Sequence, residues 1–295
     1  MPEKICRSVI LIHAQGLPIQ IVALINDTVG ALMASAYSDP KTIMGAIFGT
    51  GCNASYMENC GSIAKLGGLP DDLPMAINCE YGAFDNDRCV LPRTIYDKTI
   101  DKESPRPGEQ TFEKMSAGMY LGEIFRQVLV DFHKRGLLFM GQDTSKLYQP
   151  FVIKTSFLTN LEDDFTPKLQ RTRDDFKQLL NISLTEPERL FCRRACELVA
   201  TRGARLCTCG VSAICRKKDI TSGHVAADPL VANNPRFKAR WAQALGEVFD
   251  WPKDRKEDPI IMTSAADGSG LGAAVISAMT LERVLRGDTT GLRPE

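Results

Sequence analysis

The sequence predicts an α/β fold, because short apolar runs alternate along the chain with longer stretches of helical periodicity. The apolar runs, such as IVALI at residues 21–25, are typical of strands buried on both faces. The longer stretches carry apolar residues three or four positions apart, as helices that cover a sheet do. The chain has 295 residues, 44% of them hydrophobic, which is enough for one large domain or two modest ones. Alternation of strands and helices defines the α/β class.

The first part of the chain is expected to form three strand units. A strand over residues 21–25 leads into a polar corner and a helix over residues 29–36. An apolar run over residues 44–50 ends in a glycine-rich turn, and strand-like sequence resumes over residues 54–58, which predicts a hairpin. A further strand is expected over residues 75–79, before a long polar loop that contains several prolines.

The middle of the chain is expected to be helical. One long helix begins past Gly108 and ends at Gly136. Its apolar face is formed by Phe112, Met115, Met119, Val128 and Phe132. Residues 168–178 are highly charged and are expected to lie exposed.

The last part of the chain returns to the alternating pattern. A second long helix is expected after Thr185, an N-cap residue with Glu188 three positions on, and runs towards residue 215. A strand is expected over residues 259–262. A turn rich in small residues then leads into a helix over residues 273–283.

Charge and cysteine usage exclude several classes of function. Lys plus Arg and Asp plus Glu are both 36, so the net charge is zero and neither nucleic acid nor an anionic membrane is an expected partner. No apolar run approaches the roughly 20 residues that span a bilayer, and no secretory signal is expected at the N-terminus. The 10 cysteines show no zinc-binding spacing, so we expect reduced, mainly buried thiols and a cytoplasmic location.

A first candidate site is the polar corner Asn26-Asp27-Thr28 at the carboxyl end of the first expected strand. Open α/β sheets bind ligands at this edge, where a carboxylate can accept a hydroxyl proton and orient the oxygen for attack. An equally open interpretation is that Asn26 or Asp27 only caps the following helix.

A second candidate is the turn Gly49-Thr50-Gly51. Its glycines let backbone N–H groups approach an anion, and the threonine hydroxyl can donate to a phosphate oxygen. The same string also suits an ordinary hairpin turn. Asn53 follows it with an amide that is suited to sugar hydroxyls, as the amide of any loop asparagine would be.

Further candidates lie at the ends of other elements. Glu80 follows its strand, and Gln110 and Glu113 open the long helix. Carboxylates and amides that converge on one cleft suit a polyhydroxylated ligand, although Glu80 can be a solvated strand end and Glu113 can complement the helix dipole. The Asp267-Gly268 turn permits close approach of a nucleotide or of a neighbouring helix. The sequence motifs of P-loop enzymes, of nucleophile-elbow hydrolases and of zincins are absent from the chain.

Four strings taken in order resemble the eukaryotic hexokinase family, and the fungal glucokinases and hexokinases most closely. They are VALINDTVG at residues 22–30, IFGTGCNASYME at 47–58, AINCEYGAF at 76–84 and SPRPGEQTFEKM at 104–115. The resemblance extends from about the first expected strand to the C-terminal helix. It implies an actin-like, ribonuclease-H-like α/β fold, and transfer of the γ-phosphoryl of Mg·ATP to the 6-hydroxyl of glucose or a related hexose, the entry step of glycolysis.

The resemblance also implies roles for individual residues. Asp27 matches the catalytic base of the family. The sugar-binding positions match Asn26, Asn53, Glu80, Gln110 and Glu113. The ATP-binding positions match Thr50, Gly49, Gly51, Gly118, Met119, Asp228 and Gly268. Phosphoryl transfer needs mainly positioning, charge stabilisation and a carboxylate that receives the hydroxyl proton, so the same residues serve both arguments.

The chain also departs from the family pattern. Residues 1–295 match the large, C-terminal domain, with residues 1–20 a remnant of the preceding connection, whereas the small domain and the first phosphate loop are missing. The family's adenosine motif AADGSVY is here AADPLVA, so Pro229 and Leu230 replace glycine and serine, which predicts weaker ATP binding. A non-catalytic, sugar-sensing or regulatory protein is therefore the alternative function. Self-association is also expected, through the surface that the missing small domain would cover.

Overall fold

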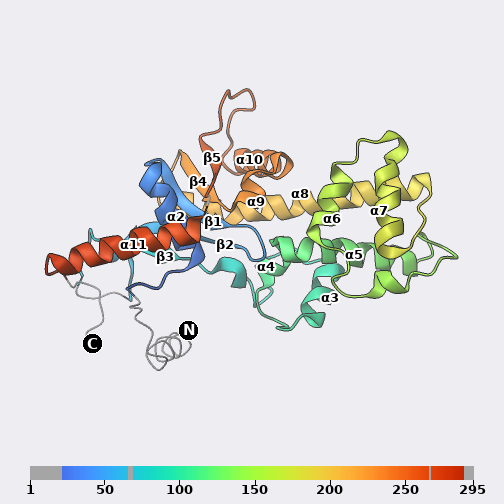
Figure 1. Ribbon diagram of the computed structural model, residues 1–295, viewed down its shortest axis with the longest axis horizontal. Helices are drawn as coiled ribbons and strands as arrows, with labels where there is room; N and C mark the ends of the chain where they lie inside the picture. Colours follow the sequence, from blue (N-terminus) through green and yellow to red (C-terminus); the bar gives the residue numbers. More distant parts are fainter. Residues whose placement is uncertain (1–21, 66–68, 266, 289–295) are drawn as a thin grey trace.

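The computed structural model describes residues 22–65, 69–265 and 267–288 of the chain, and it is built on a five-stranded mixed sheet (Figure 1). The strands are β1 (Thr42–Ile47), β2 (Asn53–Asn59), β3 (Pro74–Asn78), β4 (Gly223–Ala227) and β5 (Ile260–Ser264). Their order across the sheet is β3-β2-β1-β4-β5. The pairs β1–β2 and β2–β3 are antiparallel, and β1–β4 and β4–β5 are parallel. The expected hairpin is confirmed as β1 and β2, and the strands expected over residues 75–79 and 259–262 are β3 and β5.

The strand expected over residues 21–25 is wrong. Ile21 lies outside the described residues, and residues 22–26 have no regular secondary structure. This segment pairs with none of the five described strands. A run of apolar residues forms a strand only where a neighbouring strand takes up its backbone N–H and C=O groups, and that neighbour is lacking among the residues described.

Helices cover both faces of the sheet. They are α2 (Asp27–Ser38), α3 (Ile95–Glu103), α4 (Thr111–Ser116), α5 (Gly118–Lys134), α6 (Thr155–Glu162), α7 (Gln170–Leu180), α8 (Glu186–Lys217), α9 (Pro229–Ala232), α10 (Pro235–Val248) and α11 (Gly268–Leu285). Short 3₁₀ turns lie at Cys60–Ser62, Tyr81–Ala83, Ser145–Tyr148 and Pro167–Leu169. In Figure 1, α2 and α11 cross beside the sheet, whereas α3, α5, α6 and α7 gather around the far end of the long α8.

Alternation along the strands separates the two faces. In β4, Val225 and Ala227 belong to the main core, whereas Ala226 packs with Ala31 of α2 in a second, small cluster. A Cβ atom on Gly45 of β1 would lie 2.3 Å from the Thr28 carbonyl oxygen, so only glycine lets α2 approach the sheet this closely. Side chains two positions apart on a strand share a face, which explains this division.

The long helix expected between Gly108 and Gly136 is divided into α4 and α5. The break lies at Ala117, whose backbone is extended (φ −73°, ψ 146°). The Gly118 N–H donates to the Gly49 carbonyl oxygen at 2.7 Å, and a Cβ on Gly118 would lie 2.9 Å from that oxygen. The close contact with the β1–β2 turn therefore interrupts the helix, although the apolar periodicity continues across the break.

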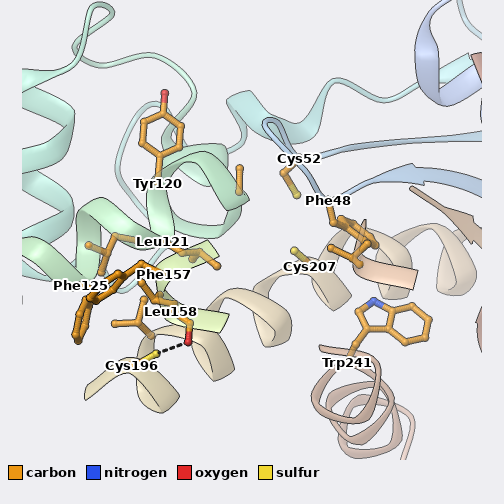
Figure 2. Packing of buried hydrophobic residues seen from close by; sticks show 14 of the residues in the cluster. Phe48, Cys52, Tyr120, Leu121, Phe125, Phe157, Leu158, Cys196, Cys207 and Trp241 are labelled. Carbon is orange, nitrogen blue, oxygen red and sulfur yellow. Dashed lines mark hydrogen bonds between the residues drawn. The ribbon is translucent and has the colours of Figure 1, made fainter. Parts of the chain in front are cut away.

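The helix expected after Thr185 is confirmed as α8, the longest helix described. Thr185 and Glu188 form a capping box at its start. Residues 168–178, expected to be exposed, fall largely in α7, which buries Phe176 completely. Figure 2 shows Leu158 of α6 beside Cys196 of α8, whose thiol donates to the Leu158 carbonyl oxygen at 3.3 Å.

Six of the nine cysteines in the described part of the chain are buried, and all nine are free thiols. The four expected on helical sequence, Cys192, Cys196, Cys207 and Cys215, lie in α8 and are among the buried ones. Among the described helices, none combines the length and the apolar character needed to cross a bilayer.

Candidate active site

The N-terminus of α2 presents a carboxylate beside a capping asparagine. The side chain of Asn26 is the N-cap: its Oδ1 accepts from the Thr28 N–H at 2.9 Å and from the Thr28 hydroxyl at 2.6 Å. Asp27 is exposed in the first helical turn, and its Oδ1 also accepts from the Thr28 N–H at 2.9 Å. Its Oδ2 accepts no hydrogen bond from the described residues. Capping is thus carried mainly by Asn26, which leaves one oxygen of Asp27 open to a ligand.

Four side chains meet in one hydrogen-bonded group at the ends of β2 and β3. Glu80 Oε1 accepts from the amides of Asn78 at 2.7 Å, Asn53 at 3.3 Å and Asn26 at 3.4 Å. The Asn53 amide also donates to Asn78 Oδ1 at 2.7 Å. We call Asn26, Asn53, Asn78 and Glu80 the amide–carboxylate cluster. Three of its members, Asn26, Asn53 and Glu80, are predicted from the sequence, whereas Asn78, two residues before Glu80 at the end of β3, is not.

The backbone fixes how Glu80 enters this cluster. Glu80 has a left-handed conformation (φ 51°, ψ 37°), which is uncommon for a residue other than glycine. Its N–H donates to Asn53 Oδ1 at 2.8 Å, and the same oxygen accepts from the Ala54 N–H at 2.8 Å. Asn53 therefore holds Glu80 with both ends of its amide group. The conformation is strained locally, and such strain is concentrated at functional sites.

Glu113 and Gln110 lie on the first turn of α4, next to the β1–β2 turn. Glu113 Oε2 accepts from the Cys52 N–H at 3.1 Å, and a Cβ on Gly51 would lie 2.8 Å from that oxygen. Gln110, the N-cap of α4, is left-handed as well (φ 54°). Its side-chain Oε1 is buried and has no hydrogen-bond partner among the described residues. A buried acceptor without a partner is costly unless a ligand supplies the donor.

The turn at Gly49-Thr50-Gly51 leads from β1 towards β2. Thr50 is exposed, and its hydroxyl makes no hydrogen bond with the described residues. Asp228, directly after β4, accepts from the Phe48 N–H through Oδ2 at 3.0 Å, which ties the end of β4 to this turn. Gly118 packs against Gly49 on the other side, as described above. The ends of β1 and β4 and the start of α5 thus converge here.

A pair of buried thiols lies next to the Gly49-Thr50-Gly51 turn. Cys52 and Cys207 of α8 face one another in Figure 2. A hydrogen bond from Cys207 lowers the pKa of the Cys52 thiol in spite of its burial, and the same bond together with burial raises the pKa of Cys207 well above its ordinary value. The pair links the Gly49-Thr50-Gly51 turn to α8, and Cys52 is the more acidic of the two thiols.

Two of the expected ATP-binding residues lie apart from these contacts. Gly268 packs at the crossing of α11 and α2, where a Cβ would lie 2.9 Å from Ala31 Cα. This contact agrees with the interpretation of the Asp267-Gly268 turn as a close approach to a neighbouring helix. Met119, 50% exposed, follows Gly118 in α5. An ATP-binding role for either residue stays a prediction.

The arrangement as a whole combines three chemical capacities. The amide–carboxylate cluster offers donors and acceptors side by side, as a polyhydroxylated ligand requires. The open oxygen of Asp27 can accept a hydroxyl proton. The Gly49-Thr50-Gly51 turn offers an unbonded hydroxyl at the end of a parallel strand, where phosphates are commonly held.

Comparison with known proteins agrees with this chemistry. Residues 43–279 match the family model described as "Hexokinase". The chain is 54% identical over 284 residues to a hexokinase of Emericella nidulans and 49% identical over 287 residues to hexokinase-1 of Saccharomyces cerevisiae. Each match covers 95% of this chain, but only 58% and 59% of those relatives. The chain therefore spans less than two thirds of the length of the proteins it matches.

A similar result comes from solved structures. A hexokinase from Schistosoma mansoni complexed with glucose superposes with a TM-score of 0.79 at 32% identity, over 90% of this chain and 60% of that one. A second hexokinase crystal structure superposes with a TM-score of 0.73 at 27% identity. These likenesses confirm the actin-like α/β fold that the sequence resemblance implied.

Proposed function

Because the chain belongs to the hexokinase family, we propose that it carries the catalytic carboxylate and the sugar-binding groups of an ATP-dependent hexose 6-phosphotransferase that acts on glucose. In this proposal the reaction is the entry step of glycolysis, and the protein works in the cytoplasm. The chain spans 58% of the Emericella nidulans relative. We therefore expect it to bind glucose by itself more readily than to phosphorylate it.

The amide–carboxylate cluster is the observation that carries the proposal. Within it, Glu80 Oε1 accepts from three amide groups at 2.7 to 3.4 Å. A sugar hydroxyl can both accept from an amide and donate to the carboxylate, so it can join this network without leaving a polar group unpaired. The unpartnered Oε1 of Gln110 offers one further acceptor for a sugar hydroxyl. Glu113 completes the proposed sugar-binding set.

We assign the transfer step to three groups. Asp27 takes the proton of the 6-hydroxyl through its open oxygen and so orients the attacking oxygen. Thr50 and the N–H groups around Gly49 and Gly51 hold phosphate oxygens. Asp228 keeps that turn in place through the Phe48 N–H. Mg²⁺ would arrive with the nucleotide phosphates and would neutralise their charge there, so that the open oxygen of Asp27 stays available to the 6-hydroxyl.

A second function, sugar sensing without catalysis, is favoured by one observation. Pro229 occupies the first turn of the short helix α9, and Leu230 beside it is 77% exposed. An exposed leucine where the family motif has a serine offers no donor to a phosphate. Proline is well tolerated at this helical position, so α9 forms without the flexibility that glycine would give. Nucleotide binding is expected to weaken while the sugar cluster is unaffected.

Glucose binding is tested by calorimetry on the purified chain. Asn53→Ala removes the amide that holds both Asn78 and Glu80, and it is expected to weaken glucose binding about tenfold or more. Asn59→Ala, at the exposed opposite end of β2, is the matched control and is expected to leave the affinity unchanged. Equal affinities of the two variants would contradict the proposed sugar site.

Catalysis is tested by glucose-dependent ADP formation with Mg·ATP. Asp27→Asn is expected to reduce turnover by about 10² to 10⁴, the usual contribution of a general base, without a matching loss of glucose affinity. Asp72→Asn, also exposed, serves as the control. Turnover that survives Asp27→Asn would refute the assigned base. Glucose binding without any turnover by the parent chain would favour the sensing function.

We also propose self-association through the outer face of α11. This helix exposes Leu281, Val284 and Leu285, which lie three and four positions apart and share this face, and it also exposes Leu271 and Met279. An apolar face of this kind favours burial against a partner of similar character. Light scattering is expected to detect oligomers that Leu281→Ser with Leu285→Ser disperses. A monodisperse monomer of the parent chain would contradict this.

A further inference from the structure

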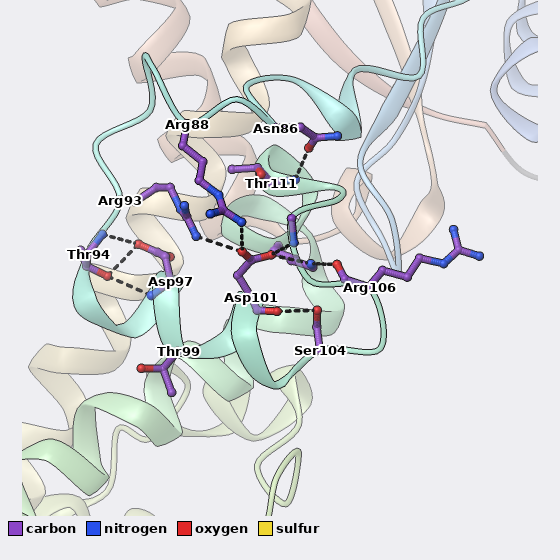
Figure 3. A network of polar contacts seen from close by, with 12 residues as sticks. Asn86, Arg88, Arg93, Thr94, Asp97, Thr99, Asp101, Ser104, Arg106 and Thr111 are labelled. Atoms are coloured by element: carbon purple, nitrogen blue, oxygen red, sulfur yellow. Dashed lines mark hydrogen bonds and ion pairs between the residues drawn. The ribbon is translucent and has the colours of Figure 1, made fainter.

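A hollow of about 610 Å³ lies beside α3, and none of its lining residues belongs to the candidate active site. The lining consists of Arg88, Leu91, Arg93, Lys98, Asp101, Lys102 and Pro107. Four of these seven residues are cationic and one is anionic. Figure 3 shows the centre of the group, where the arginines reach the carboxylate of Asp101 from two sides.

Asp101 is shared by more cations than it can neutralise. Its Oδ2 accepts from Arg88 at 3.1 Å and from Arg93 at 3.3 Å, and its Oδ1 accepts from Lys114 at 2.8 Å. Oδ1 also accepts from the Gly108 N–H at 3.0 Å. One buried carboxylate therefore faces three cationic groups, so an excess of positive charge remains around it.

The guanidinium of Arg93 is the clearest part of this excess. Its side chain is only 9% exposed, yet its single hydrogen bond within the described part of the chain is the one to Asp101. A guanidinium has five N–H donors, so most of the donors of Arg93 remain available to a ligand. Asp85 interacts electrostatically with Arg93 and offsets part of its charge, but it forms no hydrogen bond with the guanidinium, because its oxygens accept from the N–H groups of Cys89, Val90 and Leu91.

Two lysines increase the excess from the neighbouring helix. Lys98 and Lys102 lie four residues apart on α3, so they share one face, where like charges disfavour the helix. Neither forms an ion pair with the residues that the structure describes. Asp97, on the adjacent face of α3, is bonded to Arg202 at 2.7 Å and to the Thr94 cap, so it does not neutralise them. The unpaired charges of both lysines line the same hollow as Arg88 and Arg93.

We propose that this hollow binds the phosphate group of a small phosphorylated molecule. A phosphate dianion can accept charge-assisted hydrogen bonds from the N–H groups of Arg88 and Arg93 that do not contact Asp101. It also reduces the repulsion between Lys98 and Lys102. A hollow of about 610 Å³ exceeds the volume of a phosphate group, which leaves room for the rest of an ester. This site is independent of the proposed function, because it uses neither the sugar cluster nor the Gly49-Thr50-Gly51 turn.

The test is calorimetric titration of the full chain with inorganic phosphate, and in a second arm with glycerol 3-phosphate. Lys98→Ala with Lys102→Ala removes two exposed cations that form no hydrogen bond or ion pair with the described residues, and it is expected to weaken binding about tenfold. Lys253→Ala with Lys256→Ala removes the same charge from an exposed loop elsewhere and is the matched control, expected to bind as the parent does.

The outcomes separate this hollow from other sites. Selective weakening by the α3 double variant supports the proposal, and tighter binding of the ester than of inorganic phosphate identifies an ester as the occupant. If both double variants weaken phosphate binding equally, the effect comes from the overall charge of the protein and not from this hollow, and the proposal is overturned. Binding that is unchanged in the α3 variant places the phosphate at another site, such as the Thr50 turn, and overturns it as well. Absence of saturable phosphate binding by the parent chain has the same consequence.

Discussion

The crossing of α2 and α11 is so close that a single methyl group is expected to disrupt it. A Cβ on Gly272 would lie 2.2 Å from the Gly30 carbonyl oxygen and 2.5 Å from Gly30 Cα. Ordinary van der Waals contact begins at 3.4 Å, so the two helices must separate by roughly 1.2 Å to accept alanine. The backbones of the two helices are in direct contact at this point. The atoms nearest to the added methyl group are all backbone atoms of Gly30, so no side chain can move aside to make room.

The magnitude follows from two opposing effects. Overpacking of a tight contact costs about 1–3 kcal/mol or more, whereas alanine in place of glycine stabilises a helix interior by up to about 1 kcal/mol. We expect Gly272→Ala to lower the free energy of unfolding by about 2 kcal/mol, which for a chain of this size corresponds to a melting temperature lower by about 4 °C. Asn26 and Asp27 lie at the start of α2, so glucose affinity is expected to fall as well.

The control is the same substitution two residues away in the same helix. A Cβ on Gly270 would meet only the carboxylate end of Asp267, at 2.8 Å, and that side chain can rotate away. Gly270→Ala is therefore expected to be neutral or slightly stabilising through helix propensity. Thermal unfolding followed by circular dichroism measures both variants. Equal stability of Gly272→Ala and Gly270→Ala would refute the inferred backbone contact.

Three further variants test the energetics of the fold. Burial alone would raise the pKa of Asp164, but hydrogen bonds, among them one from the Thr172 N–H, hold it at about 2. This carboxylate thus stabilises the fold by about 2 kcal/mol above about pH 4, and the contribution is lost as the pH falls towards 2. In urea titrations, the free energy of unfolding of Asp164→Asn should be lower than that of the parent at pH 7, and the two values should converge in acid. A difference that does not change with pH would argue against the assignment. Arg126→Met leaves Glu123 charged and buried, which is expected to lower the free energy of unfolding by about 3–5 kcal/mol. Adding Glu123→Leu should restore much of this stability. A double variant as unstable as the single one would contradict this. Thr185→Ala removes the cap of α8 and is expected to cost about 1 kcal/mol of thermal stability, so an unchanged melting temperature would show that the cap is dispensable.

The sequence predicts correctly those elements that depend on interactions between residues close together in the chain. The β1–β2 hairpin follows from its glycine turn, and α8 follows from the Thr185–Glu188 capping box, which both occur as expected. The division between α4 and α5 could not be predicted this way. It depends on the contact of Gly118 with Gly49, two residues that are far apart in the sequence. The missing strand at residues 22–25 has the same origin, because a strand depends on the pairing that a neighbour provides.

The candidate site shows the same limit. The positions of Asn53, Glu80 and Glu113 at the ends of elements predict them from the sequence, whereas nothing comparable predicts Asn78. Its amide donates to Glu80 and its oxygen accepts from Asn53, so its importance arises only when β2 and β3 are aligned. The register that aligns them pairs Ser55 with Asn78. The sequence does place Asn78 and Glu80 two positions apart at a strand end. The role of Asn78 becomes apparent only from the pairing of β2 with β3.

The proposed sugar side and the proposed nucleotide side of the site are held by different parts of the sheet. The pairing of β2 with β3 places Asn53, Asn78 and Glu80, and the hydrogen bonds among them are complete without any residue of β4 or α9. The proposed nucleotide side instead depends on Asp228, which follows β4 and accepts from the Phe48 N–H. Substitutions such as Pro229 therefore change one half without loosening the other. A family member can in this way lose phosphoryl transfer and retain sugar recognition, which is why glucose affinity and turnover must be measured separately in this chain.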